Sequence, residues 1–243
     1  MKIITLILTI ARNMDQAKRL ETHLHEHKFP NVSMRVWPAA PKGASQKEIH
    51  KSATRNHAKT LRWFLDHHPP DEHHVIVCED DCEFMTVEPA WPKIIDALQY
   101  LDAQYPEWTT FHVGHCPLAP LLPTSHPDIV HTILPYTAHC YAMNGRQLRK
   151  LFEAHPNMDE WTRPQAIEGW CMVPWKQKFA LYPTVATQNR MPKEVNNSQL
   201  IHTIGLNRCL SIVEETFMYG VPAACLIVLV IVLVRLLMKN NNR

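Results

Sequence analysis

Residues 74–84 constrain the fold of this chain more than any other stretch, because a short apolar run ends there in three consecutive carboxylates. The run at 74–78 is rich in β-branched residues and is flanked by turn-prone polar residues, which predicts a buried strand. Glu79, Asp80 and Asp81 then follow the carboxyl end of that strand. Open α/β sheets place their ligand crevice outside the carboxyl ends of the strands, so we expect chemistry at this position.

The acidic triplet itself indicates a metal site. Three adjacent carboxylates repel one another in a partly dehydrated crevice unless a cation is bound, and hard divalent ions such as Mg²⁺ and Mn²⁺ prefer carboxylate oxygens. The alternative is a solvated turn after a strand. The strand that precedes the acids favours a site that holds a metal ion and, through it, phosphate groups.

The composition excludes several classes of protein. A chain of 243 residues is long enough for one sizeable α/β domain or two small ones. The formal net charge is +2 and the basic residues are scattered, so we expect no nucleic-acid partner. Only 6 glycines are present, and neither a G-x-G-x-x-G pattern nor a P-loop occurs.

The cysteine pattern predicts neither disulfide bonds nor a zinc site. The number of cysteines, 7, is odd, and they lack paired metal-type spacing. We interpret Cys78 as a small buried hydrophobe and Cys82 as a loop thiol.

The C-terminal segment 217–238 is almost continuously apolar. At ~1.5 Å per residue, a helix of about 20 residues crosses the hydrocarbon core, so a single-pass membrane anchor is predicted; the alternative is a buried core helix. Arg235, Lys239 and Arg243 lie at the far end and favour a cytoplasmic tail. A lumenal domain would then need an N-terminal signal. Residues 3–10 fit either a signal or the first strand of the domain; we favour the strand, which leaves the side of the membrane open.

Periodicity along the chain predicts alternating strands and helices. Strands are expected at 3–10, 33–37, 74–78, 108–113, 129–134, 138–143 and 179–182, the fifth and sixth as a pair. Helices are expected at 13–27, 46–67, 90–104 and 145–155. The alternation implies an α/β layered fold built on one mixed sheet.

The remaining segments are expected to connect these elements. Residues 117–127 form a proline-rich loop of the length of a lid or a wall of an acceptor site. The histidines of 67–74 suggest either a metal tract or a solvated loop, and the prolines among them favour the loop. We predict a domain at 1–187, a linker at 188–216, and a short basic tail at 239–243 after the apolar segment.

Several short segments together form a familiar pattern. They are residues 3–12, 53–57, 75–84, 139–143 with Leu148 and Leu151, 167–170, and 182–183 with Gln188. In this order they resemble glycosyltransferase family 25, the group that includes lipopolysaccharide galactosyltransferases and collagen galactosyltransferase modules. The triplet at 79–81 stands in the Glu-Asp-Asp position of that family.

The resemblance implies a GT-A type nucleotide-sugar-binding fold in which the acidic motif holds Mn²⁺ or Mg²⁺ across the donor diphosphate. The expected donor is a nucleotide sugar, in the first place a UDP-sugar, and the expected acceptor is a hydroxyl of a glycan or glycoprotein. A metal ion at the leaving diphosphate agrees with the charge that develops there in glycosyl transfer. The predicted protein is therefore a membrane-anchored, metal-dependent, inverting glycosyltransferase.

Roles for the residues around the triplet follow from the resemblance. Asp81 is expected to be the first metal ligand, Glu79 to contact the metal or the donor ribose, and Asp80 to be a supporting or second ligand. Arg12 and Asn13, at the end of the first strand, are candidates to contact the nucleotide.

An inverting enzyme also needs a carboxylate that deprotonates the acceptor hydroxyl as general base. Glu168 is the first candidate for this base and Asp159 the second. Arg55 and His57 are expected to orient the acidic loop or bind phosphate, with a packing role as the alternative for His57.

Two other functions fit the same residues. The first is another metal-dependent phosphate enzyme, such as a nucleotidyltransferase or phosphohydrolase, because an acidic cluster at a strand end serves those reactions equally well. The second is a non-catalytic relative that binds a glycan or a partner at the membrane. Asn56 suggests the latter, because the family usually has serine at this position.

Overall fold

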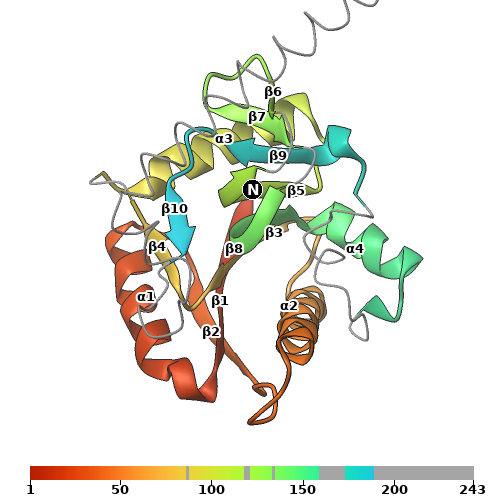
Figure 1. Ribbon diagram of the computed structural model, residues 1–243. Helices are drawn as coiled ribbons and strands as arrows, with labels where there is room; N and C mark the ends of the chain where they lie inside the picture. The colour runs from red at the N-terminus through yellow and green to blue at the C-terminus, as the bar shows by residue number, and fades with distance from the viewer. Residues whose placement is uncertain (86–87, 118–120, 133–134, 159–172, 189–243) are drawn as a thin grey trace, which may run out of the picture.

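The computed structural model describes residues 1–85, 88–117, 121–132, 135–158 and 173–188 (Figure 1). Its elements are, in chain order, β1 (Lys2–Ile10), η1 (Ala11–Asn13), α1 (Met14–Glu26), β2 (Val32–Trp37), α2 (Gln46–His67), β3 (His73–Glu79), β4 (Cys82–Phe84), α3 (Ala90–Gln104), β5 (Thr110–Pro117), β6 (Leu121–Pro123), β7 (Ile129–Thr132), β8 (Pro135–Asn144), α4 (Gly145–Ala154), η4 (Trp175–Gln177), β9 (Lys178–Leu181) and β10 (Ala186–Gln188).

An eight-stranded mixed sheet forms the centre of the fold, in the order β2-β1-β3-β8-β5-β9-β7-β6. β1 runs parallel to both β2 and β3, and β5 runs parallel to β9, whereas β8 is antiparallel to its neighbours β3 and β5. β4 and β10 form a separate antiparallel pair. The prediction of an α/β fold with a mixed central sheet is confirmed.

Helices cover both faces of the sheet, with α1 and α3 on one side and α2 and α4 on the other (Figure 1). Successive residues of β1 therefore enter two different cores. Ile3 and Ile7 pack with α1 and α3, whereas Ile4 and Leu6 pack with α2. A strand that is buried on both faces needs an almost unbroken apolar sequence, which explains why residues 3–10 also resemble a signal segment.

Side-chain caps explain where α2 and α4 begin. Ser45 and Glu48 form a capping box at the start of α2: the Ser45 backbone N–H donates to the Glu48 carboxylate at 2.8 Å, and the Glu48 N–H donates to the Ser45 hydroxyl at 3.4 Å. The Asn144 side chain accepts hydrogen bonds from two backbone N–H groups in the first turn of α4. The helices predicted at 46–67 and 90–104 have these bounds in the structure.

Three expectations about the connections are wrong. The strands predicted at 129–134 and 138–143 are β7 and β8, but β5 and β9 lie between them in the sheet, so they are not a pair. The segment 117–127 is not a loop throughout, because Leu121–Pro123 form β6, which pairs with β7 at the sheet edge. Cys82 is not a loop thiol: it begins β4 and is only 6% exposed, because β4 packs Cys82 and Phe84 into the core.

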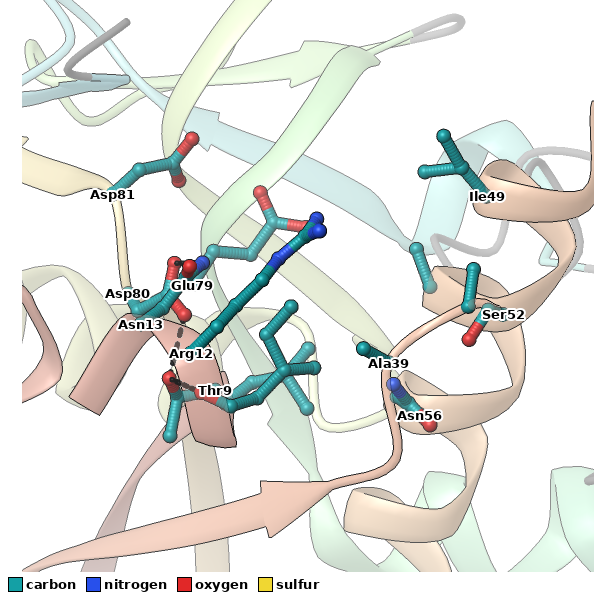
Figure 2. A pocket seen from close by; sticks show the side chains of 14 residues that line it. Thr9, Arg12, Asn13, Ala39, Ile49, Ser52, Asn56, Glu79, Asp80 and Asp81 are labelled. Atoms are coloured by element: carbon teal, nitrogen blue, oxygen red, sulfur yellow. Dashed lines mark hydrogen bonds between the residues drawn. The ribbon is translucent and has the colours of Figure 1, made fainter. Parts of the chain in front are cut away.

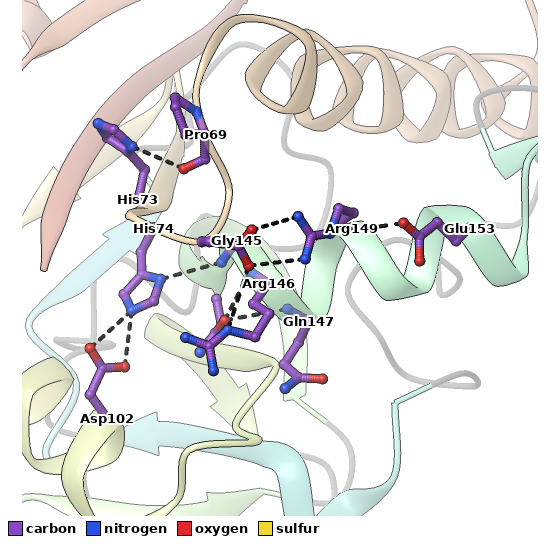
Figure 3. A network of polar contacts seen from close by, with 11 residues as sticks. Pro69, His73, His74, Asp102, Gly145, Arg146, Gln147, Arg149 and Glu153 are labelled. Carbon is purple, nitrogen blue, oxygen red and sulfur yellow. Dashed lines mark hydrogen bonds and ion pairs between the residues drawn. The ribbon is translucent and has the colours of Figure 1, made fainter.

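His74 corrects the expectation that the histidines at 67–74 lie in a solvated loop. It belongs to β3, and its Nε2 lies 2.9 and 3.1 Å from the two carboxylate oxygens of Asp102, at the end of α3 (Figure 3). Its Nδ1 accepts a hydrogen bond from the backbone N–H of Gly145, at the start of α4. Trp108 also donates to Asp102, at 2.8 Å. One imidazole thus joins β3, α3 and α4.

This network predicts a pH effect. Burial alone would raise the pKa of Asp102, but the hydrogen bonds from His74 and Trp108 outweigh it and hold the pKa below its usual value. A carboxylate whose pKa is lower in the folded protein than in the unfolded chain, where it is ~3.9, stabilises the fold. This stabilisation is complete above the unfolded pKa and is lost as the pH falls through the folded pKa. We therefore expect Asp102→Asn to lower the melting temperature at pH 7 and to have a smaller effect near pH 3, as measured by circular dichroism.

Asp96→Asn is the matched control, because Asp96 is also on α3 and also pairs with a histidine, His126, but its side chain is 70% exposed. We expect its effect to be small at both pH values. An Asp102→Asn loss of the same size at pH 7 and pH 3 would contradict the assigned role of the Asp102 charge.

Candidate functional site

Glu79, Asp80 and Asp81 lie at the end of β3, in the turn that leads into β4, and line a cavity of about 270 Å³ (Figure 2). The rest of the lining comes from the end of β1, η1, the loop after β2 and one face of α2. These residues are Leu8, Thr9, Ile10, Arg12, Asn13, Ala39, Ala40, Ile49, Ser52, Ala53 and Asn56. Because β1 and β3 are parallel, their carboxyl ends meet at this edge of the sheet, which is the position expected for a ligand crevice.

Asp80 is held by two donors from the end of β1 and η1. The Thr9 hydroxyl donates to Oδ2 at 2.6 Å, and the Asn13 side-chain amide donates to Oδ1 at 3.3 Å. Burial raises the pKa of Asp80 above its usual value; the hydrogen bonds from Thr9 and Asn13 oppose the shift, and the charge of Glu79 adds to it. A partly buried carboxylate next to a second acid is stabilised by a cation, so these residues fit a metal ion.

The cost of burying this charge can be measured. A carboxylate whose pKa is higher in the folded protein than in the unfolded chain, where it is ~3.9, stabilises the fold only in its protonated form. This stabilisation is complete below the unfolded pKa and is lost as the pH rises through the folded pKa. At pH 7 the ionised Asp80 therefore destabilises the metal-free fold. We expect Asp80→Asn to raise the melting temperature in the presence of a chelator by a few degrees, as measured by circular dichroism.

Asp15→Asn serves as the control for Asp80→Asn. Asp15 is an exposed acid in the first turn of α1, where negative charge is favourable. We expect its replacement to leave the melting temperature unchanged or slightly lower. If Asp80→Asn also failed to raise the melting temperature, burial of the Asp80 charge would not cost stability.

Glu79 belongs to a hydrogen-bonded chain that reaches the core. The Nε2 atom of His57, on α2, lies 2.9 Å from Glu79 Oε1, and its Nδ1 lies 3.0 Å from the Tyr141 hydroxyl, on β8. The His57 side chain is only 6% exposed and does not line the cavity. Its contacts are those expected of a residue that orients Glu79, and they place it behind the carboxylate and outside the lining of the cavity.

Asp81 lies between two hollows. It lines the cavity described above and also a second one of about 190 Å³, formed on the other side of the triplet by α1 and β4. Its carboxylate points away from Asp80 and Asn13 in Figure 2. A ligand in either hollow can therefore reach Asp81.

Cationic side chains surround the acidic cavity. Arg12 is exposed and extends from η1 toward the space between the triplet and α2 (Figure 2). Arg55 does not line the acidic cavity; it lines an adjoining one of about 340 Å³ together with Lys51 and Lys59. Asn56 lines both cavities. The structure thus brings Arg12 and Asn13 to the triplet and places Arg55 at the adjoining cavity.

Several contributors to the site were not predicted. Ser52 and Lys59 share the helical face of Asn56, and this three- and four-residue spacing along 46–67 was a usable signal. Thr9 reaches Asp80 because the β1–β3 register sets Leu8 opposite Glu79, which the sequence does not reveal. Tyr141 likewise comes to His57 only through strand pairing.

Some predicted positions lie outside the described residues. Asp159 and Glu168 fall within 159–172. The apolar segment and the predicted linker fall within 189–243, except for the first linker residue, Gln188, which is the last residue of β10. Among the residues that are described, no helix combines the length and apolar character needed to cross a bilayer.

The arrangement has the parts of a site for a metal ion and a phosphate. Carboxylate oxygens of the triplet offer ligands to a hard dication, and Arg12 and the lysine-rich neighbouring cavity offer positive charge to phosphate oxygens. The cavity is partly open, so a ligand can enter it from solvent.

No protein-family model and no curated protein matches the chain. A comparison of folds finds a solved structure described as "crystal structure of a glycosyltransferase involved in the glycosylation of the major capsid of PBCV-1". The two chains are 10% identical, with a TM-score of 0.33, over 74% of this chain and 72% of that chain. A likeness at this level does not bear on function.

Proposed function

We propose that this protein is a metal-dependent glycosyltransferase that moves a sugar from a nucleotide-sugar donor, in the first place a UDP-sugar, to a hydroxyl of a glycan or glycoprotein. One observation carries the proposal: the Glu79-Asp80-Asp81 triplet lines a cavity at the carboxyl end of a parallel strand pair, together with Arg12 and Asn13. The resemblance of the sequence to glycosyltransferase family 25 supports it.

The triplet would hold Mn²⁺ or Mg²⁺, with Asp81 as the first ligand and Glu79 as the second. The ion would neutralise charge on the leaving nucleoside diphosphate. Thr9 and Asn13 hold Asp80 in place, and His57 orients Glu79, so the carboxylates need little rearrangement when the donor binds.

The reaction also needs a cation that binds the diphosphate and a carboxylate that acts as general base. Arg12 would contact the diphosphate, where a guanidinium can form paired hydrogen bonds to phosphate oxygens. Glu168, or Asp159 in second place, would accept the proton of the acceptor hydroxyl. The acceptor oxygen would bond to the anomeric carbon on the face opposite the departing nucleoside diphosphate, which gives inversion. We further propose that residues 217–238 anchor the protein in a membrane.

The test is calorimetric titration of the full chain, in mild detergent, with a panel of nucleotide sugars. We expect one of them to bind with Mn²⁺ present and binding to be lost with a chelator. Binding should be followed by transfer to an acceptor glycan, detected by mass spectrometry.

Two other results would replace the proposal. Metal-dependent hydrolysis of a nucleotide without any acceptor would indicate a different phosphate enzyme. Absence of binding to every nucleotide sugar, with metal present, would indicate a non-catalytic module.

A further inference from the structure

Three cysteine thiols converge in the core directly behind the acidic triplet. Cys78 lies on β3, Cys82 begins β4 and Cys140 lies on β8. All three are buried, and their sulfur atoms lie within 4.8 Å of one another. Cys78 and Cys140 are paired across the two strands, with 3.5 Å between their sulfur atoms.

These separations suit a metal ion bound by thiolates. A Zn–S distance of ~2.3 Å with tetrahedral angles places two sulfur atoms about 3.8 Å apart. The backbone positions are already set by three strands of the core, so the sulfur atoms can close around an ion through small side-chain adjustments. Cys78 and Cys82 have a C-x₃-C spacing that lies within the range of metal ligands. No second such pair occurs and Cys140 is remote in sequence, so the sequence alone does not indicate the site.

An entry route leads to the thiols. Cys82 lines the cavity of about 190 Å³ beside α1, whose charged lining residues are Asp80, Asp81, Glu83 and Arg19. Three carboxylates against one guanidinium give this mouth a negative potential, which concentrates cations. An ion that enters would meet Cys82 first, with Cys78 and Cys140 behind it.

We propose that Cys78, Cys82 and Cys140 form a binding site for a thiophilic ion of the Zn²⁺ or Cu⁺ type. Soft thiolates select such ions, whereas Mg²⁺ and Mn²⁺ prefer carboxylate oxygens, so this site is separate from the one at the triplet. A bound ion would join β3, β4 and β8. Because Cys78 precedes Glu79 and Cys82 follows Asp81, it would also fix both ends of the acidic triplet.

Cd²⁺ is a suitable probe, because its thiolate complexes absorb in the ultraviolet by charge transfer. The full chain, reduced and stripped of metal in mild detergent, is titrated with Cd²⁺. We expect a charge-transfer band that saturates at one equivalent, persists in excess Mg²⁺, and is lost when Cu⁺ or a large excess of Zn²⁺ displaces the Cd²⁺. Cys78→Ala, Cys82→Ala and Cys140→Ala should each weaken binding by at least about tenfold.

Cys171→Ala and Cys209→Ala are the matched controls and should retain the band. A band of unchanged affinity in Cys78→Ala, or one removed by excess Mg²⁺, would overturn the proposal. A second measurement needs no variant: alkylation of the wild-type thiols, followed by peptide mapping, with and without Cd²⁺.

At a Cd²⁺ concentration of 100 times its Kd, only about one hundredth of the sites are empty. The alkylation rate of Cys82 should then fall by about 100-fold, together with those of Cys78 and Cys140. Protection of a different set of cysteines would overturn the assignment.

Discussion

Asp81→Asn should reduce metal-dependent sugar transfer by at least about 100-fold, the loss typical for one preorganised electrostatic group at a reaction centre. The substitution keeps the size of the side chain but removes the charge of the proposed first metal ligand. Asp81 is half-buried in an acidic turn, and loss of one of three like charges does not weaken packing. We therefore expect circular dichroism spectra and melting temperature close to those of the wild-type protein.

The measurement is the initial rate of transfer at saturating donor, with calorimetry of Mn²⁺-dependent donor binding beside it. Glu107→Gln is the control, because Glu107 is an exposed acid that lines none of the described cavities near the triplet. It should transfer at the wild-type rate. A turnover of Asp81→Asn within about threefold of wild type would show that Asp81 does not bind the metal.

Gly145→Ala should lower the free energy of unfolding by about 3 kcal/mol and the melting temperature by about 6–12 °C. Gly145 is the buried first residue of α4, and a Cβ atom there would collide with the backbone carbonyl oxygens of His73 and Pro70. These are backbone atoms of the first residue of β3 and of the loop before it, so relief requires α4 to move away. That movement would break the hydrogen bond from the Gly145 N–H to His74 and disturb the contact to Asp102.

Gly43→Ala is the matched control for the effect of removing a glycine. Gly43 has a φ of +83°, but no atom lies within 4 Å of the position of its missing Cβ. Its replacement should cost only the strain of a left-handed backbone, about 1–2 kcal/mol. Thermal unfolding followed by circular dichroism compares the two. Equal losses for both variants would show that the collision at Gly145 is relieved at little cost.

Much of the fold can be predicted because it depends on local patterns. The helical periodicity of 46–67 and 90–104 predicts both helices with their observed bounds. The apolar runs at 3–10 and 74–78 predict β1 and β3. The acids after the second run were expected at the carboxyl end of its strand, and they lie there.

What the local patterns do not contain is the pairing of segments that are distant in sequence. The places of β7 and β8 in the sheet, and the pairing of the short strands β4 and β10, depend on partner strands that are distant in sequence; β6, by contrast, pairs with the nearby β7. The same holds for His74, whose role depends on α3 and α4 rather than on the histidines beside it.

The candidate site likewise has one part that the sequence predicts and one part that depends on tertiary structure. The sequence by itself determined which residue types are available: three consecutive carboxylates at a strand end, with Arg12 and Asn13 at the end of another strand. Only the tertiary structure decided their surroundings. It brought Thr9 to Asp80, set His57 behind Glu79, and gathered Cys140 with Cys78 and Cys82. Strand register and helix packing place such side chains to within a few ångströms, and both depend on the whole core rather than on neighbouring residues.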